Sequence, residues 1–171
     1  TRPDFQLDLD ALAHAITPRT RAIVTVSPNN PTGAVYPEAD LRAVNRLCRE
    51  AGIYHIADEA YEYFTWEGAR HFSPAAGEGS EAHTLTLHSL SKAYGMASWR
   101  IGYLVLPAHL EAAVLKVQDT NLICAPGISQ AAAAAALAVG KAYCAGHLQS
   151  LAEVRLRVLE DAGRVAIPFT T

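Results

Sequence analysis

Charge is scarce in this sequence of 171 residues. Only 18% of the residues are Asp, Glu, Lys or Arg, and the formal net charge at pH 7 is −3. A chain without an excess of basic residues lacks the electrostatic attraction that binds proteins to nucleic acid or to an anionic membrane. We therefore expect neither nucleic acid nor a membrane among its partners.

Long apolar runs and cysteines are also scarce. No apolar run approaches the ~20 residues of a membrane span, and the first residues, Thr-Arg-Pro-Asp-Phe, lack the apolar segment of a signal peptide. The three cysteines, Cys48, Cys124 and Cys144, are odd in number and widely spaced, which argues against a disulfide framework or a zinc site. The seven histidines include no His-x-x-x-His pair. The sequence thus predicts no metal site and a reducing, cytoplasmic environment.

Strand-like and helix-like segments alternate along the chain. The expected strands are residues 22–26, 53–57, 84–87, 101–106 and 165–169. The expected helices are residues 8–16, a segment from Pro37 to Gly52, a segment from Pro107, and residues 128–139 and 148–159. This alternation predicts an α/β fold with a mostly parallel sheet flanked by helices.

Two of these segments carry a burial prediction. Residues 22–26 form a continuous, largely β-branched run, which is typical of a strand buried on both faces. Leu110, Val114 and Val117 recur on one face of the helix after Pro107, so we assign them to the core.

Polar clusters follow the first three expected strands. They contain Asn29 and Asn30, then Asp58 and Tyr61, then the stretch from Ser89 to Lys92. Ligands of parallel sheets sit beyond the carboxyl ends of the strands. We therefore expect the three loops to converge on one site.

The stretch from Ser89 to Gly102 reads Ser-Leu-Ser-Lys-Ala-Tyr-Gly-Met-Ala-Ser-Trp-Arg-Ile-Gly. A lysine in a water-poor pocket between two buried strands loses stabilisation of its charge and becomes a nucleophile that forms Schiff bases. Two serine hydroxyls and the Arg100 guanidinium are suited to a phosphate. Glycines 95 and 102 allow a close approach of the backbone. The alternative is a surface lysine in a serine-rich turn.

Each candidate residue also has a purely structural interpretation. Asp58 could cap a short helix, Asn30 could serve a turn, and Tyr61 could be an aromatic core residue. Arg100 could be a surface ion-pair partner. Glu59 and Glu62 fit a solvated or structural role better than that of a general base.

Taken together and in order, three motifs resemble a known family. They are Asn-Pro-Thr-Gly at 30–33, Asp-Glu-Ala-Tyr at 58–61, and Ser-Leu-Ser-Lys at 89–92 followed by Arg100. The set is similar to that of the class I/II aminotransferases, pyridoxal-phosphate (PLP) enzymes related to aspartate aminotransferase. The resemblance implies the central part of the PLP-binding large domain for residues 1–140 and the start of the small domain for residues 141–171.

The resemblance implies the activity and the two central residues. Such an enzyme transfers an amino group from an L-amino acid to a 2-oxo acid. Lys92 would be the catalytic residue, which forms a Schiff base with the cofactor and moves the proton at the substrate Cα. Asp58 would pair with the pyridine nitrogen, which keeps the ring an electron sink.

The remaining roles implied by the resemblance concern cofactor binding. Asn30 and Tyr61 would donate hydrogen bonds to the ring oxygen. Ser89 and Arg100 would hold the phosphate, with Ser91 as a further candidate. The peptide bond from Asn30 to the following proline is cis in this pattern.

Two other activities stay open on the same scaffold: a PLP-dependent C–S β-lyase, and a non-catalytic PLP-binding effector module such as that of a transcription regulator. Family members are homodimers of about twice this length. The upstream phosphate-binding helix, the upstream aromatic residue and the downstream substrate arginine have no counterpart here. We therefore expect a partial chain.

Overall fold

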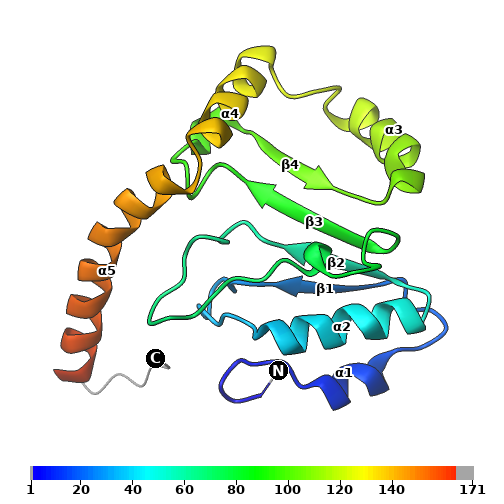
Figure 1. Cartoon of the computed structure of the whole chain (residues 1–171), viewed down its shortest axis with the longest axis horizontal. Coiled ribbons are helices and arrows are strands. Elements are labelled where there is room, and N and C mark those ends of the chain that lie inside the picture. Colours follow the sequence, from blue (N-terminus) through cyan, green and yellow to red (C-terminus); the bar gives the residue numbers. More distant parts are fainter. Residues whose placement is uncertain (1, 165–171) are drawn as a thin grey trace.

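A four-stranded sheet lies at the centre of the computed structural model, which describes residues 2–164 (Figure 1). Its order is β1 (Ala22–Val26), β2 (Tyr54–Asp58), β3 (Thr84–Ser89) and β4 (Gly102–Val105). The first three strands are parallel, and β4 runs antiparallel to β3. The predicted α/β fold with a mostly parallel sheet is confirmed.

Five α-helices accompany the sheet in the described part of the chain: α1 (Leu9–Ala15), α2 (Glu38–Glu50), α3 (Glu111–Asn121), α4 (Gly127–Val139) and α5 (Lys141–Arg164). Short 3₁₀ turns cover Pro74–Ala76, Ala97–Trp99 and Ala108–Leu110. The predicted first strand has the observed bounds, and the second begins and ends one residue later than predicted. The strand predicted at 165–169 lies outside the described residues.

Helix α2 covers one face of the sheet. Pro37 stands immediately before its first residue, a position where a fixed φ and a missing N–H do no harm. Leu41, Val44 and Cys48 form its buried stripe, as the helical spacing predicts. This stripe packs on Ile23 and Ile53, and α1 adds a second apolar layer against it. The first core therefore lies between α2 and strands β1 and β2.

A buried polar network joins α2 to the sheet. His83 Nε2 donates to Asn45 Oδ1 at 3.0 Å, and Asn45 Nδ2 donates to His55 Nδ1 at 3.2 Å and to Thr84 Oγ1 at 2.7 Å. His55 Nε2 then donates to Thr25 Oγ1 at 2.9 Å. This pattern requires a neutral His55. Burial and the nearby His83 lower the pKa of His55 to about 4.

The opposite face of the sheet is largely uncovered. Val24 of β1 is 63% exposed, so the prediction of a strand buried on both faces is wrong for this chain. All four residues of β4 are exposed as well. Helix α3 buries none of its residues, and Val117 is 61% exposed, which contradicts its assignment to the core. The cause is that no described element packs against these side chains.

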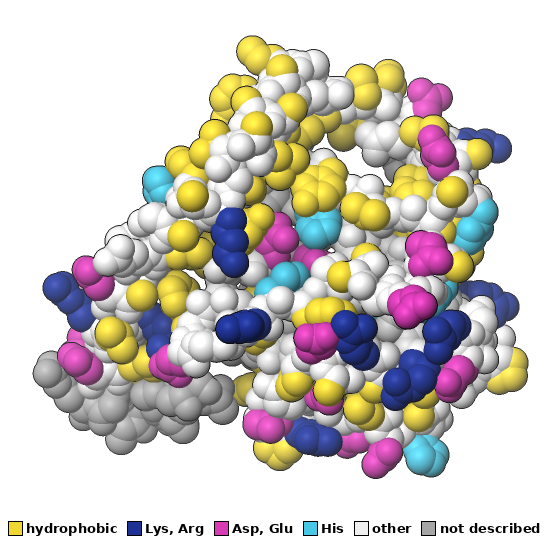
Figure 2. Space-filling view, in the orientation of Figure 1, with side chains coloured by type: hydrophobic (Ala, Val, Ile, Leu, Met, Phe, Trp, Pro, Cys, Tyr) yellow, Lys and Arg dark blue, Asp and Glu magenta, His cyan; other side chains and the backbone are white. Residues whose placement is uncertain are grey.

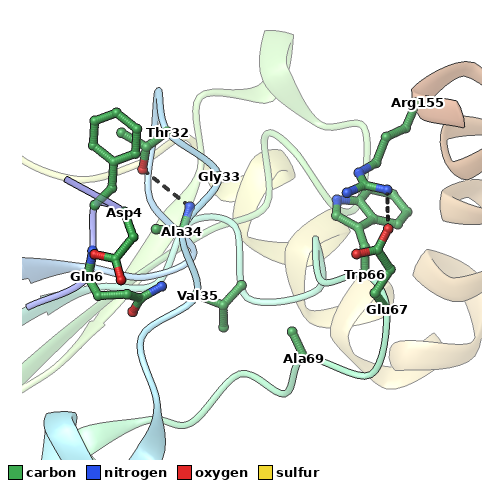
Figure 3. A pocket seen from close by; sticks show the side chains of 11 residues that line it. Asp4, Gln6, Thr32, Gly33, Ala34, Val35, Trp66, Glu67, Ala69 and Arg155 are labelled. Carbon is green, nitrogen blue, oxygen red and sulfur yellow. Dashed lines mark hydrogen bonds and ion pairs between the residues drawn. The ribbon is translucent and has the colours of Figure 1, made fainter. Parts of the chain in front are cut away.

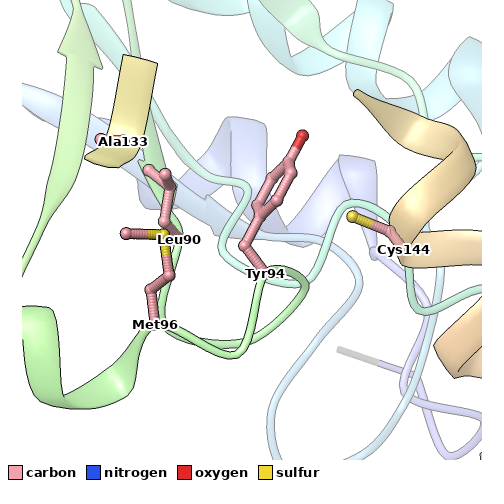
Figure 4. Packing of buried hydrophobic residues seen from close by; sticks show 5 residues of the cluster. All are labelled: Leu90, Tyr94, Met96, Ala133 and Cys144. Atoms are coloured by element: carbon pink, nitrogen blue, oxygen red, sulfur yellow. The ribbon is translucent and has the colours of Figure 1, made fainter. Parts of the chain in front are cut away.

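A second core supports the loop after β3. Leu90, Tyr94 and Met96 of that loop pack with Ala133 of α4 and Cys144 of α5 (Figure 4). Through these contacts the middle of α4 and the beginning of α5 are packed against the segment that carries Lys92. The remainder of α5 runs beside the loops of the sheet rather than its strands (Figure 1), and its Arg155 pairs with Glu67. No described helix combines the length and the apolar character needed to cross a membrane.

Candidate functional site

The candidate site lies at the carboxyl edge of the three parallel strands. Val26 and Asp58 are register partners at the ends of β1 and β2, and Asp58 also lies opposite Leu87 of β3. Because β4 is antiparallel, its first residue, Gly102, pairs with Ser89. The segment that contains Arg100 therefore enters at the same edge. The three loops converge as the sequence predicts, and the loop after β3 carries both Lys92 and Arg100.

The loop after β1 is shaped by Asn29. Its Oδ1 accepts a hydrogen bond from Thr32 Oγ1 at 2.8 Å, and its backbone carbonyl accepts one from the N–H of Gly33, also at 2.8 Å. Gly33 has φ +76°, a left-handed conformation that favours glycine. The Asn30–Pro31 bond is cis, as the resemblance implies, and the Ser27–Pro28 bond is cis too. The exposed Asn30 side chain is thereby carried at the tip of a tight loop.

Three expected site residues meet in space. Asn30 Nδ2 donates to Tyr61 Oη at 3.3 Å. Lys92 Nζ lies 5.7 Å from the centre of the Tyr61 ring. The phenol is therefore shared by an amide from the loop after β1 and an ammonium from the loop after β3. The Tyr61 hydroxyl therefore accepts a hydrogen bond from an exposed loop residue, which argues against the alternative that Tyr61 is only an aromatic core residue.

Lys92 is exposed rather than enclosed in a water-poor pocket. The strand that follows its loop, β4, is exposed, and no described segment covers the lysine. The expectation of a dry pocket between two buried strands is thus wrong for these residues. Among the described residues, Lys92 has no carboxylate partner within ion-pair distance.

The serines and Arg100 form the other side of the site. Ser89 Oγ accepts a hydrogen bond from the N–H of Ser91 at 3.2 Å, which curls the start of the loop. A side chain at Gly102 would approach the His88 carbonyl oxygen to 2.6 Å, so only glycine fits there. Arg100 is in the left-handed region at φ +51°, and its Nη1 donates to the Ala97 carbonyl at 3.0 Å. It is not a surface ion-pair partner within the described chain.

Asp58 reaches the same edge but bonds only to its own loop. Its Oδ1 accepts from the N–H of Ala60 at 3.0 Å, which forms a turn rather than the cap of a helix. Neither Asp58 nor Arg100 makes a hydrogen bond to another expected site residue in residues 2–164. The structure thus brings Asn30, Tyr61 and Lys92 into contact. Asp58 and Arg100 lie in the same loops, but neither is hydrogen-bonded to these three residues.

A second polar cluster lies beside this edge. Glu59 is 2% exposed; its Oε1 accepts from Ser73 Oγ at 2.7 Å and its Oε2 lies 2.8 Å from His71 Nε2. This confirms its structural role. His88 lies near Glu62 and stacks on Tyr103 with ring centres 4.5 Å apart. Burial alone lowers the pKa of His88, but the neighbouring carboxylates, first of all Glu62 at 3.7 Å, raise it overall.

A cavity of about 370 Å³ opens elsewhere (Figure 3). It lies between the loop at residues 32–35, the segment at 66–69 and Arg155 of α5, which pairs with Glu67 at 2.8 Å. None of the expected site residues lines it. The Arg155–Glu67 pair, 88 positions apart, carries no local sequence signal and was not predicted.

Comparison with known proteins identifies relatives. Residues 1–159 match the family model "Aminotransferase class I and II". The chain is 44% identical over 133 residues to the aspartate/prephenate aminotransferase of Thermus thermophilus, covering 78% of this chain and 34% of that protein. It is 37% identical over 165 residues to the probable N-succinyldiaminopimelate aminotransferase DapC of Mycobacterium tuberculosis, covering 96% of this chain and 41% of that protein.

Solved structures agree. A double mutant of Thermus thermophilus aspartate aminotransferase superposes with a TM-score of 0.89 at 37% identity, covering 95% of this chain and 43% of that one. The N-succinyldiaminopimelate aminotransferase of Mycobacterium tuberculosis also gives a TM-score of 0.89, at 35% identity, and covers 94% of this chain and 42% of that one. The chain therefore spans less than half the length of the relatives it matches.

Proposed function

Because the chain belongs to the class I and II aminotransferase family, we propose that it is part of an enzyme that transfers an amino group from an L-amino acid to a 2-oxo acid. The family depends on pyridoxal phosphate. The observation that carries the proposal is the meeting of Asn30, Tyr61 and Lys92 at the carboxyl edge of the sheet. Those three side chains come from separate loops, and local structure alone gives no reason for their convergence.

The side chains present fit this cofactor. Lys92 and Arg100 are cations without a carboxylate partner among the described residues, and Ser89 and Ser91 come immediately before Lys92 in the chain. The Arg100 guanidinium and two hydroxyls form a donor set suited to a phosphate, and Lys92 supplies a separate amine. Asn30 and Tyr61 supply hydrogen-bond donors for an oxygen anion.

When bound, pyridoxal phosphate supplies an aldehyde for the covalent link and an electron-withdrawing ring next to the substrate Cα. In our proposal Lys92 provides the amine for that link and then carries the proton at the substrate Cα. Asp58 holds a proton on the ring nitrogen. Asn30 and Tyr61 orient the ring through its oxygen, and the remaining three side chains bind the phosphate: Ser89, Ser91 and Arg100.

We extend the proposal to the rest of the molecule. Residues 1–140 belong to the large domain and 141–171 begin the small one; the break between α4, which ends at Val139, and α5, which begins at Lys141, supports this division. Exposed apolar side chains on α3 and α4 support a homodimer. Three free cysteines support a cytoplasmic location.

The test is covalent trapping followed by turnover. The full chain is incubated with pyridoxal phosphate, reduced with borohydride, digested and mapped, and the unreduced protein is assayed with L-amino acids and a 2-oxo acid. We expect one lysyl adduct on Lys92 and amino transfer to the 2-oxo acid. Lys92→Ala should lose both, whereas Lys116→Ala, on the exposed α3 helix, should lose neither.

Other outcomes separate the competing functions. Release of ammonia and a thiol from a cysteine conjugate, without amino transfer, would identify a β-lyase. An adduct on Lys92 without turnover of any amino acid would favour a binding module. An adduct that persists in Lys92→Ala would overturn the assignment of the site.

A further inference from the structure

Two glutamates and a histidine converge beside the proposed cofactor site. One ligand atom from each of Glu59, Glu62 and His88 lies within 4.8 Å of the others, and His88 Nδ1 is 3.7 Å from Glu62 Oε2. In a tetrahedral site with bonds of about 2.1 Å, ligand atoms are about 3.4 Å apart. Small side-chain rotations therefore bring the three atoms to the spacing of ligands around one ion.

The histidine has an unsatisfied atom that points to a ligand. His88 Nδ1 is buried and has no hydrogen-bond partner, while its Nε2 hydrogen-bonds to Thr86 Oγ1 at 3.0 Å. The side chain is 11% exposed and is fixed by stacking on Tyr103. A buried ring nitrogen without a partner loses its solvation, and a cation bound between it and the carboxylates restores the missing interaction.

Glu59 is already oriented as a ligand would be. Ser73 Oγ and His71 Nε2 bond to its two oxygens, and this fixes the carboxylate while each oxygen keeps a second lone pair. Such an outer shell of hydrogen bonds is usual around metal ligands. Figure 2 shows acidic and histidine side chains together in the centre of this face.

We propose that Glu59, Glu62 and His88 form a binding site for a first-row divalent transition-metal ion such as Zn²⁺. One imidazole nitrogen and two carboxylate oxygens are a borderline donor set, which suits Zn²⁺ better than Mg²⁺ or Ca²⁺. Three protein ligands leave one position of a tetrahedral ion for water. The proposed metal site does not include Lys92 and does not rest on the proposed transfer activity.

The prediction of no metal site is at odds with this proposal, because it rested on widely spaced cysteines and on the absence of histidines at helical spacing. Here the ligands come from two segments: Glu59 and Glu62 follow β2, and His88 lies in β3. Parallel pairing of the two strands brings them together, with Asp58 opposite Leu87. Only the register of the sheet supplies this signal.

The first experiment measures zinc binding by the full chain. Isothermal titration calorimetry with Zn²⁺ is compared for the native protein, Glu62→Gln and His88→Asn, with circular dichroism to verify folding. We expect each variant to lose one zinc site or to bind it at least about 10-fold more weakly. Glu67→Gln and His14→Asn, exposed residues away from the cluster, are the matched controls and should bind zinc as the native protein does.

A second measurement does not depend on the variants' stability. X-ray absorption of the zinc-loaded native protein should show one imidazole and otherwise oxygen ligands. Several imidazoles or a sulfur ligand in that shell would overturn the proposal, because the cluster contains neither. Equal zinc stoichiometry and equal affinity in the native protein and both folded cluster variants would overturn it as well.

Discussion

Side chains at the carboxyl edge of the sheet divide into two kinds. Glu59 is held in place by Ser73 and His71, which bond to its two carboxylate oxygens. Lys92 and Arg100 have no carboxylate partners in the part of the chain described. Polar groups left without structural partners at an edge where loops converge are available for a ligand. The distinction separates the proposed cofactor residues from their neighbours in the same motifs.

The proposed role of Asp58 gives a prediction at this scale. Asp58→Asn keeps an acceptor oxygen for the N–H of Ala60, so the turn and the cofactor adduct should survive. The amide has no charge to hold a proton on the ring nitrogen. We therefore expect the transfer rate to fall by about 100-fold or more. Single-turnover kinetics measure this step; near-native rates would contradict the role, and Asp40→Asn on α2 is the control.

Helix α2 is joined to the sheet by two different devices, an apolar stripe and a hydrogen-bonded network. The network runs from His83 through Asn45 to His55 and Thr25, and thus links α2 with β1 and β2. His55 is fully buried and accepts from Asn45 at Nδ1. A proton on that nitrogen would remove the acceptor and place a charge in the core.

Stability should therefore depend on pH through His55. The folded-state pKa is about 4 and the ordinary value is 6.5, so the unfolded chain takes up the proton first as the pH falls. The stabilisation is complete above about pH 6.5 and is lost between about pH 6.5 and 4, by up to about 3 kcal/mol. Urea denaturation across this range measures it. His55→Gln should flatten the dependence, whereas the exposed His14→Gln should not.

The apolar stripe of α2 gives a second prediction for an element. Leu41 is 1% exposed, so Leu41→Ala should lower the free energy of unfolding of the chain by about 2–5 kcal/mol. Leu115 on α3 is 58% exposed, and Leu115→Ala should cost about 0.5 kcal/mol or less. Urea denaturation of the two variants measures both changes. An equal loss of unfolding free energy in the two would contradict the prediction, because it would mean that Leu115 is packed against a surface outside the described residues.

At the scale of the whole molecule, one half of the structure is packed and the other is not. Helices α1 and α2 cover one face of the sheet, while apolar side chains of β4, α3 and α4 remain exposed. Figure 2 shows hydrophobic side chains gathered over α4. The chain spans 34% of the Thermus relative and 41% of the Mycobacterium relative. The chain thus exposes apolar surface while matching less than half the length of these two relatives.

The uncovered surface predicts self-association of the isolated 171 residues. Exposed apolar patches of this kind lead to association in water. Sedimentation velocity should show a weight-average mass that rises with concentration, and a dye that binds apolar surface should fluoresce strongly. Leu122→Ser together with Ile123→Ser, both more than two-thirds exposed, should reduce the association without unfolding the α2 side. A monomer at all concentrations that does not enhance the fluorescence of the dye would contradict this prediction.

The sequence alone determined the α/β fold, the bounds of β1, the buried stripe of α2 and the motifs that place Asn30, Asp58 and Lys92 at strand ends. These features are local, because periodicity, turn chemistry and strand propensity act over a few residues. The family followed from the order of the motifs, and the similar proteins confirmed it.

Tertiary structure alone decided which of these residues touch and which faces stay open. The meeting of Asn30 with Tyr61, the pairing of Glu67 with Arg155 and the cluster around His88 join residues far apart in the chain. The exposure of Val24 and Val117 could not be predicted either. An apolar side chain favours burial, but the sequence does not show whether another element is present to cover it. Contacts between distant segments depend on the register of the strands and on which elements cover each face of the sheet. Local sequence patterns determine neither of these.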